Sequence, residues 1–111
     1  MPQIRVVPSI ELSDKEELLK AVSQEMSKLT GKNEQWVMAS IEPNVSMSFS
    51  GSTEPCCYAE VKNIGPMETQ KFQQSLALLI SDKTGIPTNR IFIRYENVAG
   101  SQWGHDNRMF G

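Results

Sequence analysis

Hydrophobic and polar residues alternate with two different periods along this chain of 111 residues. Residues 4–7 follow the two-residue period of a strand, and Pro8 ends the run. Between residues 14 and 30 the apolar positions recur three or four apart, as on the buried side of an amphipathic helix; they are Leu18, Leu19, Val22, Met26 and Leu29. Residues 36–42 again favour a strand. The first third of the chain is therefore predicted to be strand, helix, strand.

Both ends of the expected first helix carry sequence signals. Ser13 and Glu16 have the spacing of a capping box, and Asp14 adds negative charge at the end of a helix that favours it. Gly31 stands where a left-handed C-terminal cap is expected.

The second half repeats the same order of elements. Residues 44–55 have the composition of a loop, and residues 57–61 favour a strand. Gly65-Pro66 is expected to open a second helix, and Gly85 is expected to close it. The apolar stripe of this helix consists of Phe72, Leu76, Leu79 and Ile80. Residues 91–95 then favour a strand.

The two halves match at an offset of 54 positions, which pairs Thr30-Gly31 with Thr84-Gly85 and Pro2 with Cys56. A helical crossover makes the two strands of each half parallel. The predicted fold class is therefore α+β, with two pseudo-symmetric β-α-β repeats that form a four-stranded mixed sheet with two helices on one face. The strands are apolar enough that the other face is expected to need cover, so we expect an oligomer.

Size and charge narrow the possible functions. The length is that of a single domain, 1–111. A net charge of −2 and a pI of about 5.4 give no basic surface for nucleic acid or an anionic membrane. The sequence has no apolar run long enough for a membrane span and no signal-peptide pattern, so a cytoplasmic location is expected. Neighbouring Cys56 and Cys57 are unsuited to a disulfide with each other, and two cysteines are too few for a cysteine-rich zinc site.

The dipeptide Met1-Pro2 offers a candidate base. Removal of the methionine leaves a secondary amine on Pro2, and an α-amino group starts from a pKa of about 7.7–8.0, which partial burial brings towards neutrality. Such a base suits general acid–base catalysis. The alternative is that Pro2 only pre-sets the backbone at the start of a strand.

Several short segments in a fixed order carry a resemblance to a known family. They are Met1-Pro2, Thr30-Gly31-Lys32, residues 47–56 (MSFSGSTEPC), Asn63-Ile64-Gly65 and residues 87–91 (PTNRI). Together they resemble the macrophage migration inhibitory factor family of the tautomerase superfamily, to which D-dopachrome tautomerase is related. The resemblance implies a homotrimer whose sheets enclose a central barrel, with active sites at the subunit boundaries. It also implies keto–enol tautomerisation of arylpyruvates such as phenylpyruvate, with Pro2 as general acid and base and no cofactor or metal.

The resemblance also implies roles for four further residues. Lys32 would bind the substrate carboxylate, although alone it reads as a solvated lysine near a helix C-terminus. Ile64 would offer its backbone N–H, or it is a plain residue before a helix. Trp36 and Phe110 would form aromatic walls of the pocket, or they pack in the core and the tail.

This sequence departs from the family pattern at several positions. Phe92 stands where a tyrosine comes from the adjacent subunit, so a phenolic hydrogen bond to the substrate is missing. Arg94 stands where an asparagine is usual; it either adds a second cation for the carboxylate or shifts the specificity, and its charge is expected to lower the pKa of Pro2. In the polar tail, 97–111, Trp103 and His105 fall at the pocket rim, and a catalytic or metal-binding His105 is disfavoured.

Two further activities known in the family bear on the prediction. The Cys-x-x-Cys pair of members discussed as thiol–disulfide oxidoreductases is missing, because Ala59 occupies the position of its second cysteine, so this activity is not expected. The alternative to an enzyme is a signalling or receptor-binding protein with weak or vestigial tautomerase activity, exported without a signal peptide.

Overall fold

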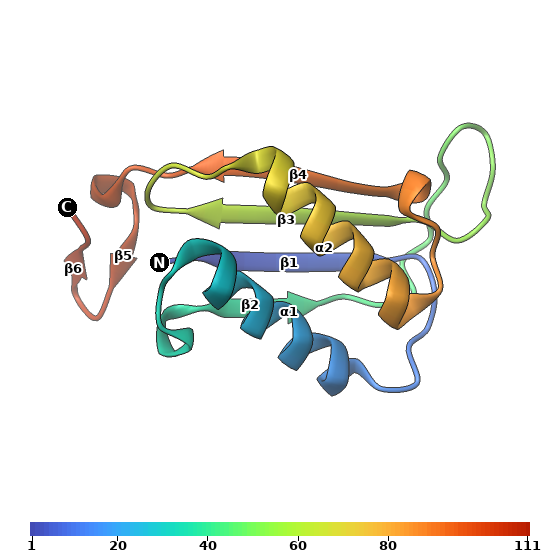
Figure 1. The fold of residues 1–111 in the computed structure, drawn as a ribbon, viewed down its shortest axis with the longest axis horizontal. Helices are drawn as coiled ribbons and strands as arrows, with labels where there is room; N and C mark the ends of the chain where they lie inside the picture. Colours follow the sequence, from blue (N-terminus) through green and yellow to red (C-terminus); the bar gives the residue numbers. More distant parts are fainter.

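Four strands form one sheet in the order β2-β1-β3-β4 in the computed structural model, which describes residues 1–111 (Figure 1). The strands are β1 (Gln3–Pro8), β2 (Met38–Ile41), β3 (Cys57–Asn63) and β4 (Ile91–Asn97). The outer pairs, β1 with β2 and β3 with β4, are parallel, and the two central strands are antiparallel. Each half of the chain therefore supplies one parallel pair, and the predicted mixed sheet is confirmed.

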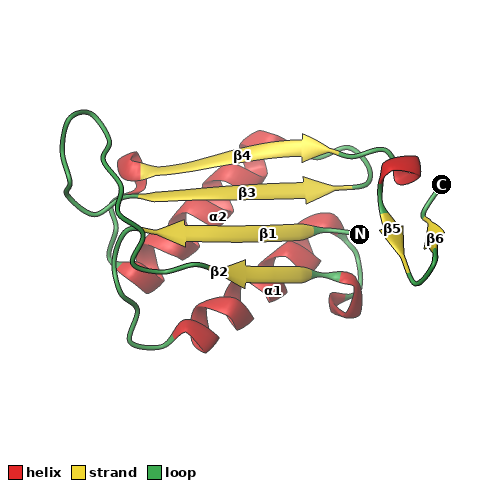
Figure 2. Cartoon of the chain, turned by 180° about the vertical axis from the view of Figure 1, so that it is seen from behind, coloured by secondary structure: helices red, strands yellow, loops and turns green.

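Two helices, α1 (Lys15–Thr30) and α2 (Thr69–Thr84), lie on the same face of the sheet (Figures 1 and 2). Alternate residues of the central strands point towards the helices. In β3, buried and half-buried residues therefore alternate along the whole strand. The core between helices and sheet is one cluster that includes Ile4, Val6, Val22, Met26, Val61, Phe72, Leu76, Ile80 and Ile86. Burial of this apolar surface is the main force that holds the two layers together.

The 54-residue repeat extends to the details of the backbone. α1 and α2 occupy matching positions, and the short 3₁₀ helices Glu34–Trp36 and Thr88–Arg90 match as well. Gly31 and Gly85 both adopt the left-handed conformation, with φ values of 70° and 80°. The predicted strand over residues 36–42 is shorter than expected, because the first of these residues belongs to the 3₁₀ turn.

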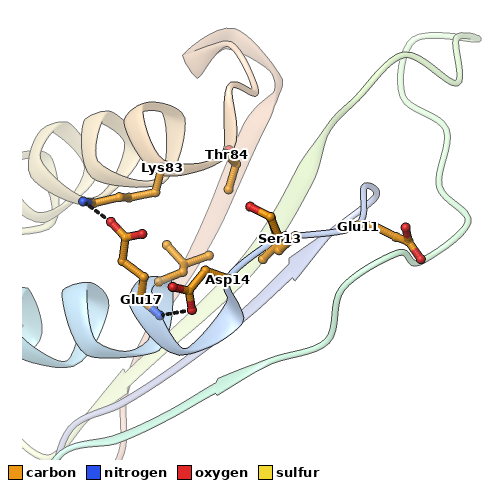
Figure 3. Close-up of a pocket in the computed structure, with 8 residues that line it drawn as sticks. Glu11, Ser13, Asp14, Glu17, Lys83 and Thr84 are labelled. Carbon is orange, nitrogen blue, oxygen red and sulfur yellow. Dashed lines mark hydrogen bonds and ion pairs between the residues drawn. The ribbon is translucent and has the colours of Figure 1, made fainter.

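Both predicted helix starts need correction. Asp14, and not Ser13, caps α1, because its carboxylate accepts the N–H of Glu17 at 3.1 Å (Figure 3). α2 begins at Thr69 and not at Pro66, because Gly65 has φ +123° and its N–H donates to the Asn97 side chain at 3.0 Å, which holds the chain in a loop.

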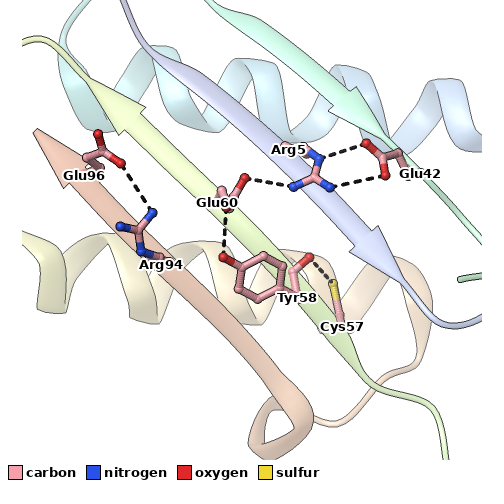
Figure 4. A network of polar contacts seen from close by, with 7 residues as sticks. All are labelled: Arg5, Glu42, Cys57, Tyr58, Glu60, Arg94 and Glu96. Carbon is pink, nitrogen blue, oxygen red and sulfur yellow. Dashed lines mark hydrogen bonds and ion pairs between the residues drawn. The ribbon is translucent and has the colours of Figure 1, made fainter. Parts of the chain in front are cut away.

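The face of the sheet that carries no helix, called the polar face below, carries a charged network and also exposes Met38 and Phe92, which are 52% and 46% exposed. The guanidinium of Arg5 donates to Glu42 and to Glu60, each at 2.8 Å, and Tyr58 donates to Glu60 at 3.0 Å (Figure 4). The apolar residues of β1 and β3 fall mainly on the helix side, and the other side carries Arg5, Glu60 and Lys62. The expectation that an oligomer covers this face stays a prediction.

The tail is more ordered than its composition suggested. It forms a 3₁₀ turn, Gly100–Gln102, and a small hairpin of β5 (Gly104–His105) and β6 (Arg108–Met109). Asp106 and Asn107 both have positive φ, as a two-residue hairpin turn requires, and this dipeptide was the available signal. The hairpin lies at the same end of the molecule as the N-terminus (Figures 1 and 2). No helix has the length and apolarity needed to cross a membrane.

Candidate active site

Pro2 is fully buried at the start of the central strand β1. Its carbonyl accepts the N–H of Met38 at 3.0 Å, which extends the β1–β2 ladder to the end of the sheet. The turn after α1, the loop after β3 and the C-terminal hairpin are found at this same end (Figure 2). A ligand at Pro2 would therefore meet residues from four separate parts of the chain.

Lys32 is one of the charged residues that the fold brings to this end. Its ammonium donates to the carbonyl of Ile64 at 2.7 Å and to Oδ1 of Asn63 at 3.2 Å. The side chain can reach them because the left-handed Gly31 turns the chain out of α1, and the hydroxyl of Ser27 then holds the Lys32 carbonyl at 2.6 Å. Lys32 is thus held at both its backbone and its side-chain end.

Burial and Lys32 together lower the pKa of the N-terminal amine from its ordinary value of 8.0. Burial acts because a charged ammonium loses hydration there, and Lys32 acts because its positive charge opposes a second one. In this structure the amine belongs to Met1, and Pro2 lies one residue deeper. Both causes would therefore act on the Pro2 amine when Met1 is absent.

The loop after β3 presents a free donor. The N–H of Ile64 makes no hydrogen bond within the chain, whereas its carbonyl accepts from Lys32. The loop is fixed on either side, because Val98 donates to the carbonyl of Asn63 at 2.8 Å and Gly65 donates to Asn97. A fixed, unpaired N–H is a suitable group to bind an oxygen of a ligand.

Aromatic rings from two distant segments meet beside this end of the sheet. Trp36 lies edge-on to Phe110 with ring centroids 6.4 Å apart, and edge-on to His105 at 5.9 Å. These rings, with Asp106, Arg108 and Met109, line a cleft of about 390 Å³. The predicted wall residues Trp36 and Phe110 are therefore brought together, although 74 positions separate them.

A second cleft of about 350 Å³ opens on the polar face of the sheet. Its lining is Gln3, Met38, Lys62, Glu96, Val98, Gln102 and Trp103. Gln3 directly follows Pro2, and the other strand residues stand beside it in register across the sheet. Trp103 therefore lines a cleft at this end of the sheet, and its role at the rim of a substrate pocket stays a prediction.

The sequence profile described as Macrophage migration inhibitory factor (MIF) matches residues 1–111. The chain belongs to the macrophage migration inhibitory factor family. A crystal structure of a homologue from Prochlorococcus marinus is 38% identical, with a TM-score of 0.93, and covers 98% of this chain and 99% of its own. The homologue from Brugia malayi is 30% identical over 96 residues, which is 84% of each chain. The factor from Meriones unguiculatus is 29% identical over 98 residues, covering 86% of this chain and 85% of its own.

Two of the residues taken from the family pattern lie away from Pro2 within one chain. Phe92 is half exposed on the polar face of the sheet, near its far end, and its ring packs on Phe49 with centroids 4.6 Å apart. Arg94 pairs with Glu96 at 3.3 Å on the same face (Figure 4). The cation that acts on the N-terminal amine in one chain is therefore Lys32, not Arg94.

Asn63 has no role of its own in the site that the sequence predicts. It is the buried polar side chain of this end, 3% exposed, and it contacts Lys32 directly. The available signal was its position, because it continues the buried phase of β3 after Ala59 and Val61, where an amide needs a partner.

Other groups with chemical potential lie elsewhere. A depression of about 130 Å³ beside the Asp14 cap is closed by the Glu17–Lys83 ion pair at the opposite end of the sheet (Figure 3). Burial raises the pKa of the Cys57 thiol to about 12, so it is not a thiolate at neutral pH. No group of three or more His, Cys, Asp or Glu side chains is placed to hold a metal ion.

Proposed function

We propose that this protein is a tautomerase that interconverts the keto and enol forms of arylpyruvates such as phenylpyruvate, with the amine of Pro2 as general acid and base. The observation that carries the proposal is the burial of Pro2 at a terminus where Lys32 lowers the pKa of the N-terminal amine, because these conditions bring an amine towards neutrality. Membership of the macrophage migration inhibitory factor family supports the same reaction class.

The proposed reaction is a proton transfer. The neutral amine of Pro2 takes a proton from the carbon next to the keto group, and the C–H electron pair forms the C=C bond of the enol. The keto oxygen takes the negative charge, accepts a hydrogen bond from the free N–H of Ile64 and then receives the proton from the protonated Pro2, which restores the neutral amine. Lys32 binds the carboxylate, while Trp36 and Phe110 contact the aromatic ring of the substrate.

Removal of Met1 is a condition of this mechanism. With Met1 attached, the nitrogen of Pro2 is a tertiary amide, which has no basic lone pair. The intact mass of the purified chain reports the state of this terminus, and a chain that retains Met1 should have no activity.

We also propose that the active protein is a homotrimer. In this assembly the polar faces of three sheets surround a central barrel, and Phe92 and Arg94 reach the active site of the neighbouring subunit. The location of both residues far from their own Pro2 supports this arrangement. The charged network of Arg5, Glu42 and Glu60 suits a hydrated barrel wall, where surface ion pairs keep their water.

The test is turnover of phenylpyruvate by Pro2→Gly, compared with wild type whose mass shows that Met1 is absent. We expect kcat/KM to fall by about 10²-fold or more, because loss of a general base typically costs 10²–10⁴-fold. Cys56→Ala, at the matching position of the second repeat, is the control and should keep wild-type turnover. Equal turnover by Pro2→Gly, with the oligomer intact by light scattering, would sink the proposal.

A further inference from the structure

Asn63 ends β3 on its buried side, where the preceding inward residues are apolar. An amide at such a position is costly unless its polar atoms are bonded, and this side chain is only 3% exposed. Packing alone would therefore favour an apolar residue. The amide calls for an explanation in terms of what it binds.

The side chain of Asn63 binds Lys32. Its Oδ1 accepts from the ammonium at 3.2 Å, next to the carbonyl of Ile64 at 2.7 Å. An ammonium has three N–H donors, and these two oxygens use two of them. One donor is left for a ligand, and its direction is set by the two bonds already made. Lys32 is thus a cation with one oriented N–H and not a freely moving charge.

The matching positions at the opposite end of the sheet show that the fold does not require this pair. At the position that matches Asn63 stands Ser9, whose hydroxyl accepts a backbone N–H from Cys56 at 2.9 Å. At the position that matches Lys32 stands Ile86, which is fully buried. The lysine of the first repeat and the asparagine of the second therefore meet only at the end of the sheet that also contains the buried Pro2.

We propose that Asn63 is a positioning residue that orients the ammonium of Lys32 towards the carboxylate of a 2-oxo acid ligand. The inference rests on the proposed function for the identity of that ligand. It predicts that Asn63 affects the recognition of anionic ligands and not that of neutral ligands of the same shape.

The experiment measures binding of 3-phenylpropionate and of its neutral amide by calorimetry, because neither compound can react. Asn63→Leu removes the acceptor at similar volume and should weaken the anion about tenfold, as the loss of a charge-assisted contact does, with little change for the amide. Lys32→Ala should have the same selectivity. The double variant should be no weaker than Lys32→Ala alone, because the two residues act as one unit.

A matched control is Asn97→Ala, which releases Gly65 in the same loop and does not touch Lys32. Its ratio of anion to amide affinity should equal that of the wild type. If Asn63→Leu weakens both compounds equally, or if its effect adds fully to that of Lys32→Ala, Asn63 has only a structural role and the inference is wrong.

Asn63→Asp provides a second variant should the leucine variant fail to fold, since it keeps both the shape and the acceptor. The new carboxylate competes for Lys32, so the anion should bind at least tenfold more weakly while the amide binds as before. Unchanged binding of the anion would overturn the inference. Phenylpyruvate turnover on the same preparations tests the proposed function separately, because it can fail while selective anion binding persists.

Discussion

The two repeats of this protein share a backbone and differ in chemistry. Each supplies two parallel strands, a helix of the same length, a left-handed glycine and a 3₁₀ turn at matching positions. Thr30 and Thr84 even bond in the same way, each donating its hydroxyl to a carbonyl four residues earlier, at 2.7 and 2.6 Å. The residues that follow the two glycines differ in chemical type between the repeats.

Beyond the glycine, the first repeat has Lys32 and the second has Ile86, which completes the core. At another matching pair, Trp36 lines a cleft. Arg90 instead lies over the ring of Phe49 at 5.3 Å and donates to backbone carbonyls of the loop that contains Phe49. One end of the sheet therefore keeps an open, polar site, and the other is closed by packing. Duplication of a backbone does not duplicate a site, because the side chains just outside the repeated elements decide the chemistry.

Substitution at the matching positions 32 and 86, each with the type of residue found at the other, should give the largest difference in unfolding free energy. Ile86→Lys puts an unpaired charge into the core and should destabilise the fold by about 4 kcal/mol or more. Lys32→Ile leaves Oδ1 of the buried Asn63 without its donor, so it should lower the unfolding free energy by about 1–3 kcal/mol, and it should abolish selective binding of carboxylates. Denaturant unfolding of both variants checks this, and similar losses of stability would show that the two ends are packed alike.

Loss of Arg90 should loosen only the closed end. Arg90→Ala removes charged donors from the carbonyls of Pro55 and Glu54, at 3.0 and 3.1 Å, and should cost about 2 kcal/mol. Hydrogen exchange should rise in residues 44–55. The matching variant, Trp36→Ala, should leave exchange in this loop as in the wild type, and a rise there would contradict the separation of the two ends.

The dependence on pH should reveal a single functional amine. Burial and Lys32 lower the pKa of the N-terminal amine, and we expect both to act on Pro2 once Met1 is removed. The neutral base is then present above the lowered pKa and is lost as the pH falls through it. We expect log kcat/KM for phenylpyruvate to fall about one unit per pH unit on an acidic limb centred below 8.0. Lys32→Ala removes the repulsion and should move this limb to higher pH. A wild-type limb at or above 8.0 would contradict the assignment.

The smallest expected loss of stability comes from the two left-handed glycines, and it should be the same in both repeats. Gly31→Ala and Gly85→Ala each place a side chain on a left-handed residue with open space around it, so the cost is conformational and should be about 1 kcal/mol for each. Thermal or denaturant unfolding measures both. A difference larger than about 1 kcal/mol would indicate that the two turns are not equivalent.

Local patterns were sufficient for most of the fold. The periods of apolar residues, the glycines at both helix ends and the 54-residue offset predicted the two β-α-β units and the layer of helices, because these signals act between neighbours in sequence. The same signals misplaced both helix starts, because neighbouring residues offer competing starts: Ser13 or Asp14 as the cap of α1, and Pro66 or Thr69 as the first residue of α2. The hairpin of the tail was missed, since only its two turn residues mark it.

The sequence by itself determined the repeated backbone and, through a family resemblance, the candidates Pro2 and Lys32. Only the tertiary structure decided which residues meet. It brought Asn63 and Ile64 to Lys32, paired Trp36 with Phe110, and moved Phe92 and Arg94 to the polar face. The physical reason is that burial and contact depend on strand order and on the ends of the sheet, where segments distant in sequence converge and share one environment.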